Sequence, residues 1–394
     1  MFEYFPENYA WSLAVMMADS CGGAIGEIDE ACRPLRPYAG QPGAASAQAW
    51  SESWLRIADR VRAQADADAR LGRTFSAGRK HRRACTYYMM AERQMPHADP
   101  GRMSVYRRML DQFAAWQVAQ EQPAERCAVP YEGTTLPALF VRAGPPGGPC
   151  MVMFDGFDIM KETICLMDVH EDFRRRGISL LIVDHPGVGE ALRLQGLKGM
   201  PESERPATAS LDYLLARGDV DPARIGIIAP SAGGYHAVRS AALEPRFACC
   251  VAWTGVWNWG ALFERRLKGA LAQSVHFHLE HAEWVYGARG VEDVIRKMAS
   301  MHLEGIADKL RCPLLVTHGE SDRQTPVDEA HKVYEAAVHS PRRELRVFAP
   351  AEGGCEHCHV DNQTLGTDYM ADWVAQVLGG HLGPAASHET GDAR

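Results

Sequence analysis

The sequence predicts an α/β protein in which an N-terminal helical domain precedes a mostly parallel, doubly wound sheet that carries a helical insertion. Three observations predict this architecture. Residues 1–122 show helical periodicity without a β-rich run, short apolar runs then alternate with amphipathic segments, and residues 262–309 lack a clear strand pattern. Short apolar runs are typical of parallel strands buried on both faces, and their alternation with helices predicts a doubly wound sheet.

The composition narrows the class of protein. A length of 394 residues with 46% apolar and 23% charged residues indicates a globular protein of two to three units. The net charge of −8 argues against a nucleic-acid partner. Eleven scattered cysteines indicate reduced thiols and a cytoplasmic location. The acidic, aromatic N-terminus does not resemble a secretion signal, and the longest apolar run, residues 248–263, is too short for a membrane span.

The first 122 residues are expected to form a helical domain. Apolar residues recur near a 3.6-residue period over residues 50–73, 79–93 and 103–121, which predicts three amphipathic helices. The many apolar residues of segment 1–38 favour a homodimer formed through the helical domain or the insertion. At the other end of the chain, residues 383–394 are small and polar, and we expect a disordered tail.

Residues 123–382 are expected to form the catalytic domain, with the helical insertion at about 262–309. The apolar runs place a β-hairpin at residues 126–131 and 136–142, and further strands at 151–154, 178–183, 225–229, 249–253, 314–318 and 345–348. Helices are expected at residues 165–176, 208–217, 234–243, 327–337 and 368–378.

Ser231 lies where an apolar strand runs into small residues and then into a helix. A nucleophile elbow is a strained strand-to-helix turn that exposes a serine hydroxyl above the sheet, and it needs small neighbours because strand and helix nearly touch. The usual pattern is G-x-S-x-G, and Ala229 takes the place of its first glycine here. We expect Ser231 to be a nucleophile. The alternative is a turn with an incidental serine.

An acid is expected after the strand at residues 314–318. Asp322 follows this strand at its carboxyl end, which is the edge where open α/β sheets carry their sites. A carboxylate there can orient a histidine and stabilise its protonated form. Asp328 is a weaker alternative because it is expected at the start of a helix, and Asp322 itself could instead cap a turn.

A histidine after the last strand would complete the chain order Ser, Asp, His. We expect His357 to be the base, with His359 as the alternative. Metal binding is the competing interpretation, because Cys355 and Cys358 flank these histidines. No second cluster at zinc-site spacing accompanies them, so no metal and no cofactor are expected. The insertion contains three further histidines, which we expect to be solvated or to face the substrate: His276, His278 and His281.

The loop after the first core strand is expected to form part of an oxyanion hole. One backbone N–H donor should come from the residue after the nucleophile, Ala232, and the other from Phe157. Gly156 lets the backbone approach closely at this point. Each such donor contributes a few kcal/mol to transition-state stabilisation.

Together these features resemble the α/β-hydrolase superfamily across residues 126–380. More narrowly, the chain is similar to the group that contains 2,6-dihydroxypseudooxynicotine hydrolase, the fungal heptaketide hydrolases of melanin biosynthesis and the FrsA-like proteins. The features that carry the narrower likeness are the helical N-terminal segment, Gly156-Phe157-Asp158 with Lys161-Glu162, the segment Asp184 to Glu190, the turn at Ser231, and Glu356-His357-Cys358-His359. The resemblance implies an α/β-hydrolase fold, a triad of Ser231, Asp322 and His357, and a helical domain that closes over the site.

The resemblance also implies a serine hydrolase that cleaves a carbon–carbon bond next to a carbonyl in an acyl-aromatic or polyketide-like small molecule. Two alternatives stay open: a carboxylester or thioester hydrolase with the same triad, and a non-catalytic FrsA-like binding or regulatory protein. A flat substrate needs apolar walls with a few polar anchors. The candidates for substrate contact are Gly156, Asp158, Trp253, Trp257, Trp259, His276, Tyr87 and Tyr88, although aromatic residues at these spacings also serve as packing residues.

Overall fold

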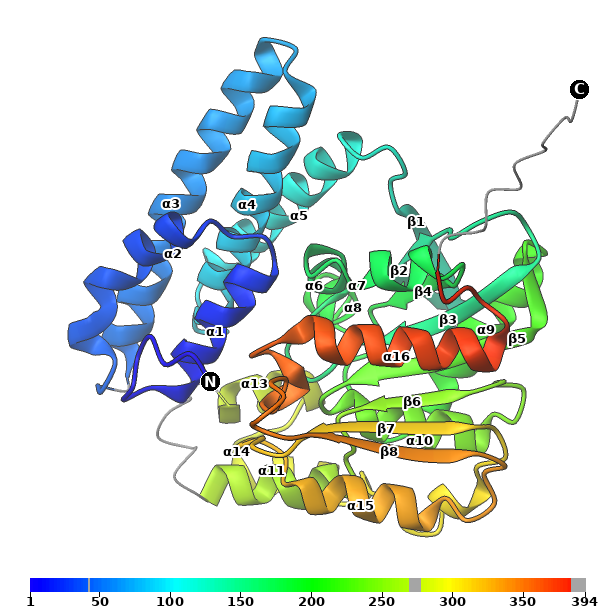
Figure 1. Cartoon of the computed structure of the whole chain (residues 1–394). Coiled ribbons are helices and arrows are strands. Elements are labelled where there is room, and N and C mark those ends of the chain that lie inside the picture. Colours follow the sequence, from blue (N-terminus) through cyan, green and yellow to red (C-terminus); the bar gives the residue numbers. More distant parts are fainter. Residues whose placement is uncertain (42, 269–277, 384–394) are drawn as a thin grey trace, which may run out of the picture.

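The computed structural model describes residues 1–41, 43–268 and 278–383. A helical region lies beside one end of an α/β region, as Figure 1 shows. His276 and the predicted tail from residue 384 onward lie outside the described residues. No described helix is long and apolar enough to cross a membrane.

The helical region is built around two long antiparallel helices and a third that packs on them. Trp50, Trp54, Ile57, Ala58 and Val61 form the buried stripe of the longest helix, as the periodicity predicts. The helices are α1 (Tyr9–Ser20), α2 (Ile25–Cys32), α3 (Ala44–Arg70), α4 (Thr74–Arg93) and α5 (Arg102–Val118), with a 3-10 turn at Arg33–Tyr38.

The apolar residues of segment 1–38 are used inside the chain. Trp11, Val15, Ile28 and Leu35 are all buried in the same core as α3 and α4. The homodimer therefore stays a prediction, and the buried residues of this segment are not available to form its interface.

Eight strands form one mixed sheet with the order β1-β2-β4-β3-β5-β6-β7-β8. The first two strands form an antiparallel hairpin, β2 pairs antiparallel with β4, and all other pairs are parallel. The strands are β1 (Glu125–Tyr131), β2 (Thr134–Val141), β3 (Gly148–Phe154), β4 (Ser179–Val183), β5 (Val220–Pro230), β6 (Cys250–Trp253), β7 (Leu314–Gly319) and β8 (Arg343–Phe348).

Helices cover both faces of the sheet, so alternate residues of each central strand enter different cores. Met151 and Met153 of β3 pack with the helical region and with α6, α7 and α16, whereas Val152 and Phe154 pack with α9, α10 and α15 on the other face. These helices are α6 (Lys161–Leu166), α7 (Val169–Arg175), α8 (Gly189–Arg193), α9 (Glu204–Arg217), α10 (Gly233–Leu243), α15 (Val327–Ala336) and α16 (Gln363–Leu378).

One predicted helix differs in the structure. The helix expected at residues 165–176 is divided into α6 and α7, because Asp168 adopts a left-handed conformation with φ +56°. Arg82 of α4 donates to Leu166 O at 2.5 Å and to the Asp168 carboxylate at 2.7 Å, so the helical region fixes this break. Between β6 and β7 the chain forms α11 (Trp259–Lys268), α13 (His278–Tyr286) and α14 (Gly290–Met298), with a 3-10 turn at Ala307–Lys309.

Candidate active site

Ser231 occupies a tight turn between β5 and α10. Its φ is +59°, a left-handed conformation that a non-glycine residue rarely adopts. The turn is held by hydrogen bonds from Ser231 N to Trp253 O and from Gly234 N to Ser231 O, both 2.8 Å. A Cβ at Gly234 would lie 1.9 Å from Thr254 O, so glycine is required there for the close approach of helix and strand.

The alanine at position 229 fits this turn because its neighbour is small. A Cβ at Gly233 would lie 2.6 Å from the Ala229 Cβ. Residues 229 and 233 therefore cannot both carry a Cβ, and Gly233 leaves the room that the Ala229 methyl group needs. The departure from the usual pattern does not prevent the strained turn from forming.

His357 lies between Ser231 and Asp322 and bonds to both. Its Nε2 is 2.8 Å from Ser231 Oγ, and its Nδ1 donates to Asp322 Oδ2 at 2.7 Å. The other carboxylate oxygen, Oδ1, accepts from the backbone N–H groups of Gln324 and Thr325 at 2.7 and 2.9 Å, which fixes the carboxylate within its own loop. The structure thus brings the three predicted residues into one hydrogen-bonded chain.

The electrostatics of this chain are set by burial and by the Asp322 charge. Burial lowers the pKa of His357, but the Asp322 carboxylate, with Cys358, outweighs burial and raises that pKa above its ordinary value of 6.5. Burial likewise raises the pKa of Asp322, but the His357 interaction outweighs it and the net shift is downward. Asp322 is therefore held as an anion beside the imidazole.

His359, the alternative base, bonds to groups other than Ser231 and Asp322. Its Nδ1 is 2.7 Å from Gly354 O and its Nε2 is 3.1 Å from Thr317 Oγ1. Burial lowers its pKa to about 4, so the ring is neutral at pH 7. Asp328, the alternative acid, lies in the first turn of α15. No group of three or more ligand-type side chains that could hold a metal ion occurs in the described part of the chain.

The proposed oxyanion donors lie beside Ser231. Neither Phe157 N–H nor Ala232 N–H donates to a backbone carbonyl among the described residues. A Cβ at Gly156 would lie 3.0 Å from Pro230 O and 3.1 Å from the Ser231 Cβ, so glycine allows the loop to approach the serine. His281 of α13 donates from Nε2 to Phe157 O at 3.2 Å and thereby holds this loop from the other side.

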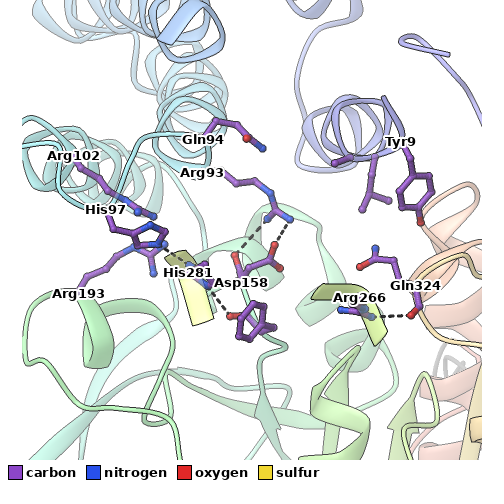
Figure 2. A pocket seen from close by; sticks show the side chains of 13 residues that line it. Tyr9, Arg93, Gln94, His97, Arg102, Asp158, Arg193, Arg266, His281 and Gln324 are labelled. Atoms are coloured by element: carbon purple, nitrogen blue, oxygen red, sulfur yellow. Dashed lines mark hydrogen bonds and ion pairs between the residues drawn. The ribbon is translucent and has the colours of Figure 1, made fainter. Parts of the chain in front are cut away.

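A cavity opens above Ser231, between the helical region and the α/β region. Its wall near Ser231 is largely apolar, and includes Leu13 and Met17 of α1, Ile164, Met167, Phe157 and Trp253. The cavity continues into a polar arm, shown in Figure 2, whose wall includes Tyr9, Arg93, Arg102, Arg193, Arg266, Gln324 and the histidines 97 and 281. Leu13, Arg93, Phe157, Asp158, Arg266 and Gln324 line both parts.

Some of the residues predicted to contact substrate line the cavity, and others do not. Gly156, Asp158 and Trp253 line the cavity near Ser231. Trp257 and Trp259 are not part of this wall: the Trp257 N–H donates to Glu329 at 3.1 Å, and the Trp259 indole donates to Tyr286 at 2.9 Å.

The two tyrosines of α4 lie within the helical region and do not line the cavity. The Tyr87 hydroxyl donates to Glu27 at 2.7 Å, and the Tyr88 hydroxyl bonds to Asp59. Both rings are fully buried in the packing of α4 against its neighbours. In this region the aromatic residues serve packing.

Comparisons with known proteins agree with this architecture. The prolyl oligopeptidase family profile matches residues 186–381. The chain is 26% identical to the hydrolase AcrC of Aspergillus aculeatus over 90% of this chain and 93% of that protein. It is 26% identical to 2,6-dihydropseudooxynicotine hydrolase of Paenarthrobacter nicotinovorans over 84% of both chains. The chain has the α/β-hydrolase fold.

Solved structures share the fold of this hydrolase, including much of its helical region. The crystal structure of 2,6-dihydroxy-pseudo-oxynicotine hydrolase matches with a TM-score of 0.74 at 22% identity, over 94% of this chain and 98% of that one. AbyA5 matches with a TM-score of 0.64 at 19% identity, over 88% of this chain and 94% of that one.

The motif residues Lys161, Glu162, Asp184 and Glu190 form a buried ionic cluster under the active-site loops of the hydrolase. Lys161 Nζ lies 2.7 Å from Glu162, 2.8 Å from Asp184 and 2.6 Å from Glu190. Asp184 also accepts from the backbone N–H groups of Lys161 and Glu190 at 3.0 and 2.8 Å, which ties the starts of α6 and α8 together.

The ionic cluster continues to Asp155, the residue that precedes the oxyanion loop. Burial, with the nearby charge of Asp184, raises the pKa of Asp155 well above its ordinary value, so this carboxyl is held in its neutral form. Burial lowers the pKa of Lys161, but the charge of Asp184 outweighs it and keeps the ammonium protonated. We infer that these residues position the loops rather than contact substrate.

Proposed function

We propose that this hydrolase is a serine enzyme that cleaves a carbon–carbon bond next to a carbonyl in an acyl-aromatic or polyketide-like small molecule. The observation that carries the proposal is the hydrogen-bonded chain from Ser231 Oγ through His357 to Asp322. In the first step Ser231 Oγ attacks the carbonyl carbon while its proton passes to His357 Nε2. Asp322 stabilises the imidazolium that forms.

The tetrahedral intermediate carries a negative charge on the former carbonyl oxygen. The N–H groups of Phe157 and Ala232 would donate to this oxyanion, since neither donates to a backbone carbonyl among the described residues. When the intermediate collapses, the carbon–carbon bond breaks and its electron pair passes into an enolate. The proton on His357 then neutralises the enolate, and water hydrolyses the acyl-enzyme with His357 as base.

A carbon leaving group requires a second carbonyl or an aromatic ketone that can accept the electron pair. The apolar wall formed by Trp253, Phe157 and Leu13 suits a flat substrate of this kind. The names of similar proteins support the same class, because they include a 2,6-dihydropseudooxynicotine hydrolase and a 20-hydroxy-prefusarin hydrolase. Ester hydrolysis by the same three residues is the second candidate, since the chemistry of acyl transfer to Ser231 is shared.

Product analysis with two substrates tests the proposal. We expect purified enzyme to cleave 1-phenyl-1,3-butanedione to benzoate and acetone, or to acetophenone and acetate, as identified by mass spectrometry. Phenyl butyrate serves as the ester comparison. Turnover of the ester without cleavage of the diketone would favour the second candidate. If neither is cleaved and a fluorophosphonate probe forms no adduct with Ser231 in the folded protein, the hydrolase would have a binding role and both catalytic candidates fail.

The pKa of His357 predicts an alkaline-shifted rate profile. The base must be neutral to accept the Ser231 proton, and its pKa is raised above 6.5 by Asp322 in spite of burial. Reactivity is therefore lost as pH falls through this raised pKa. We expect the rate constant for inactivation by a fluorophosphonate to rise with pH, with a midpoint above 6.5.

The Asp322→Asn variant provides the control for this profile. Removing the carboxylate charge should lower both the maximal rate and the midpoint of the pH profile, because the charge that raises the His357 pKa is gone. A wild-type midpoint at or below that of the variant would contradict the assignment.

A further inference from the structure

The polar arm of the active-site cavity contains a buried arginine without a carboxylate partner. Arg266 of α11 is 6% exposed, and its guanidinium stacks on the Trp259 ring with the two centres 4.9 Å apart. Its Nη2 donates to Gln324 O at 3.0 Å, whereas its Nε has no hydrogen-bond partner among the described residues. A buried guanidinium N–H without a partner is costly, so this group is a candidate for ligand binding.

The other arginines of the arm already have carboxylate partners, although Arg102 Nη1 also lacks a hydrogen-bond partner among the described residues. Arg93 forms an ion pair with Asp158. Arg102 and Arg193 share Glu92 at 2.7 and 3.1 Å, and Glu280 adds a second negative charge near Arg102. Figure 2 shows these groups apart from Arg266, which lies with Gln324 on the other side of the arm.

The histidines of the arm add no positive charge. Burial lowers the pKa of His97 to about 2 and that of His281 to about 4. Asp322 and Asp158 act on Arg266 electrostatically, but no carboxylate of the described residues lies within ion-pair distance of it. One positive charge is therefore left for a ligand, which suits a single negative charge better than the double charge of a phosphate.

A second buried donor lies close to Arg266. The buried Tyr9 hydroxyl of α1 makes no hydrogen bond of normal geometry among the described residues, and the side chain that it approaches is that of Gln324, above which Figure 2 shows it. Burial, with the nearby charge of Asp322, raises the Tyr9 pKa above its ordinary value, so the hydroxyl keeps its proton and remains a donor. Arg266 and Gln324 also line the part of the cavity that contains Ser231 and His357.

We propose that Arg266, Tyr9 and Gln324 form a carboxylate subsite, so that the substrate is an acyl compound bearing one carboxylate beyond the carbonyl that Ser231 attacks. The proposal rests on the proposed function for the position of the reacting carbonyl. A guanidinium binds a carboxylate through two parallel N–H···O bonds, and the hydroxyl and amide supply further donors. The subsite joins α1 to the catalytic region, so the helical region would take part in substrate selection.

Binding of a matched pair of ligands tests the subsite independently of turnover. The ligands are 4,6-dioxo-6-phenylhexanoate and its methyl ester, titrated by calorimetry into the Ser231→Ala protein. We expect the acid to bind about 10- to 100-fold more tightly than the ester, as for a charge-assisted hydrogen-bonded pair. Adding Arg266→Gln should reduce this ratio to about one, whereas Arg266→Lys should retain part of it.

Arg265→Gln is the matched control, because it removes the same charge from the exposed neighbouring residue of α11 and should leave the ratio unchanged. Tyr9→Phe removes one hydroxyl and should lower the ratio about threefold, which keeps the proposal testable if Arg266→Gln does not fold. Equal or undetectable binding of the two ligands, or a ratio that survives Arg266→Gln, overturns the subsite. Cleavage of the same diketone by wild-type enzyme is measured separately, so failure of the proposed function is distinguishable from failure of the subsite.

Discussion

Ser231→Ala is expected to lower kcat on a cleaved 1,3-diketone by about 10⁶-fold, and His357→Ala by a similar factor. The two side chains act as one unit, because the serine is a poor nucleophile unless the imidazole 2.8 Å away accepts its proton. The kcat of the double variant should therefore lie within a few-fold of the kcat of either single variant. If the two residues acted independently, their effects on kcat would multiply. Single-turnover kinetics measure all three proteins on one substrate.

His359→Gln is the control that separates the two neighbouring histidines. His359 bonds to Gly354 O and lies against Thr317, so its loss should affect folding of the loop more than the chemical step. We expect the folded variant to keep kcat within about tenfold of wild type. The assignment of His357 as base would be contradicted if His359→Gln abolished turnover while His357→Ala retained it, or if Ser231→Ala kept more than a tenth of the activity.

The sequence could locate Ser231, Asp322 and His357 because each depends on a local rule. The serine lies in a strand–turn–helix pattern with small neighbours, and the acid and the histidine each follow the carboxyl end of a parallel strand. Parallel strands end at one edge of the sheet, so the fold class predicts that these side chains come together. Between His357 and His359 the sequence offered no such rule. In the folded loop His357 bonds to Ser231 and Asp322, whereas His359 bonds to Gly354 O and Thr317.

Tyr9, Arg93, Arg266 and Gln324 could not be predicted as cavity residues. They come from α1, α4, α11 and the loop after β7, and they meet because the helical region packs on the α/β region. Such packing leaves no periodic signal in the chain. Tyr87 illustrates the opposite error, since an aromatic residue on an amphipathic helix has the same pattern whether it lines a site or fills a core.

The motif around Lys161 was visible in the sequence, but its role depends on contacts that the sequence does not specify. Residues 161, 184 and 190 come from α6, the loop after β4 and α8, and they meet in one buried cluster. Asp184 is held as an anion by the Lys161 ammonium 2.8 Å away, whereas burial raises the pKa of Glu162 to about 7 in spite of the same ammonium. Burying a charge without a partner costs several kcal/mol, so removing one member of the cluster destabilises the members that remain.

Lys161→Met is accordingly expected to lower the free energy of unfolding by about 3–5 kcal/mol, the usual cost of removing one partner of a buried ion pair. Urea denaturation followed by circular dichroism measures this change. In the variant, Asp184 and Glu162 should have raised pKa values, because both are fully buried and lose the cation that they share. The folded state then binds more protons than the unfolded state, so the loss of stability should be smaller at pH 5 than at pH 8.

Lys332→Met is the matched control for this prediction, since Lys332 is 53% exposed and pairs with Glu329 at 3.4 Å on the surface of α15. Its loss should change the free energy of unfolding by no more than about 0.5–1 kcal/mol at either pH. If Lys161→Met behaved like Lys332→Met, the buried cluster would not be what holds the loops after β3 and β4 together. The larger loss, with the stated pH dependence, requires that the ammonium of Lys161 neutralises carboxylates that water cannot reach.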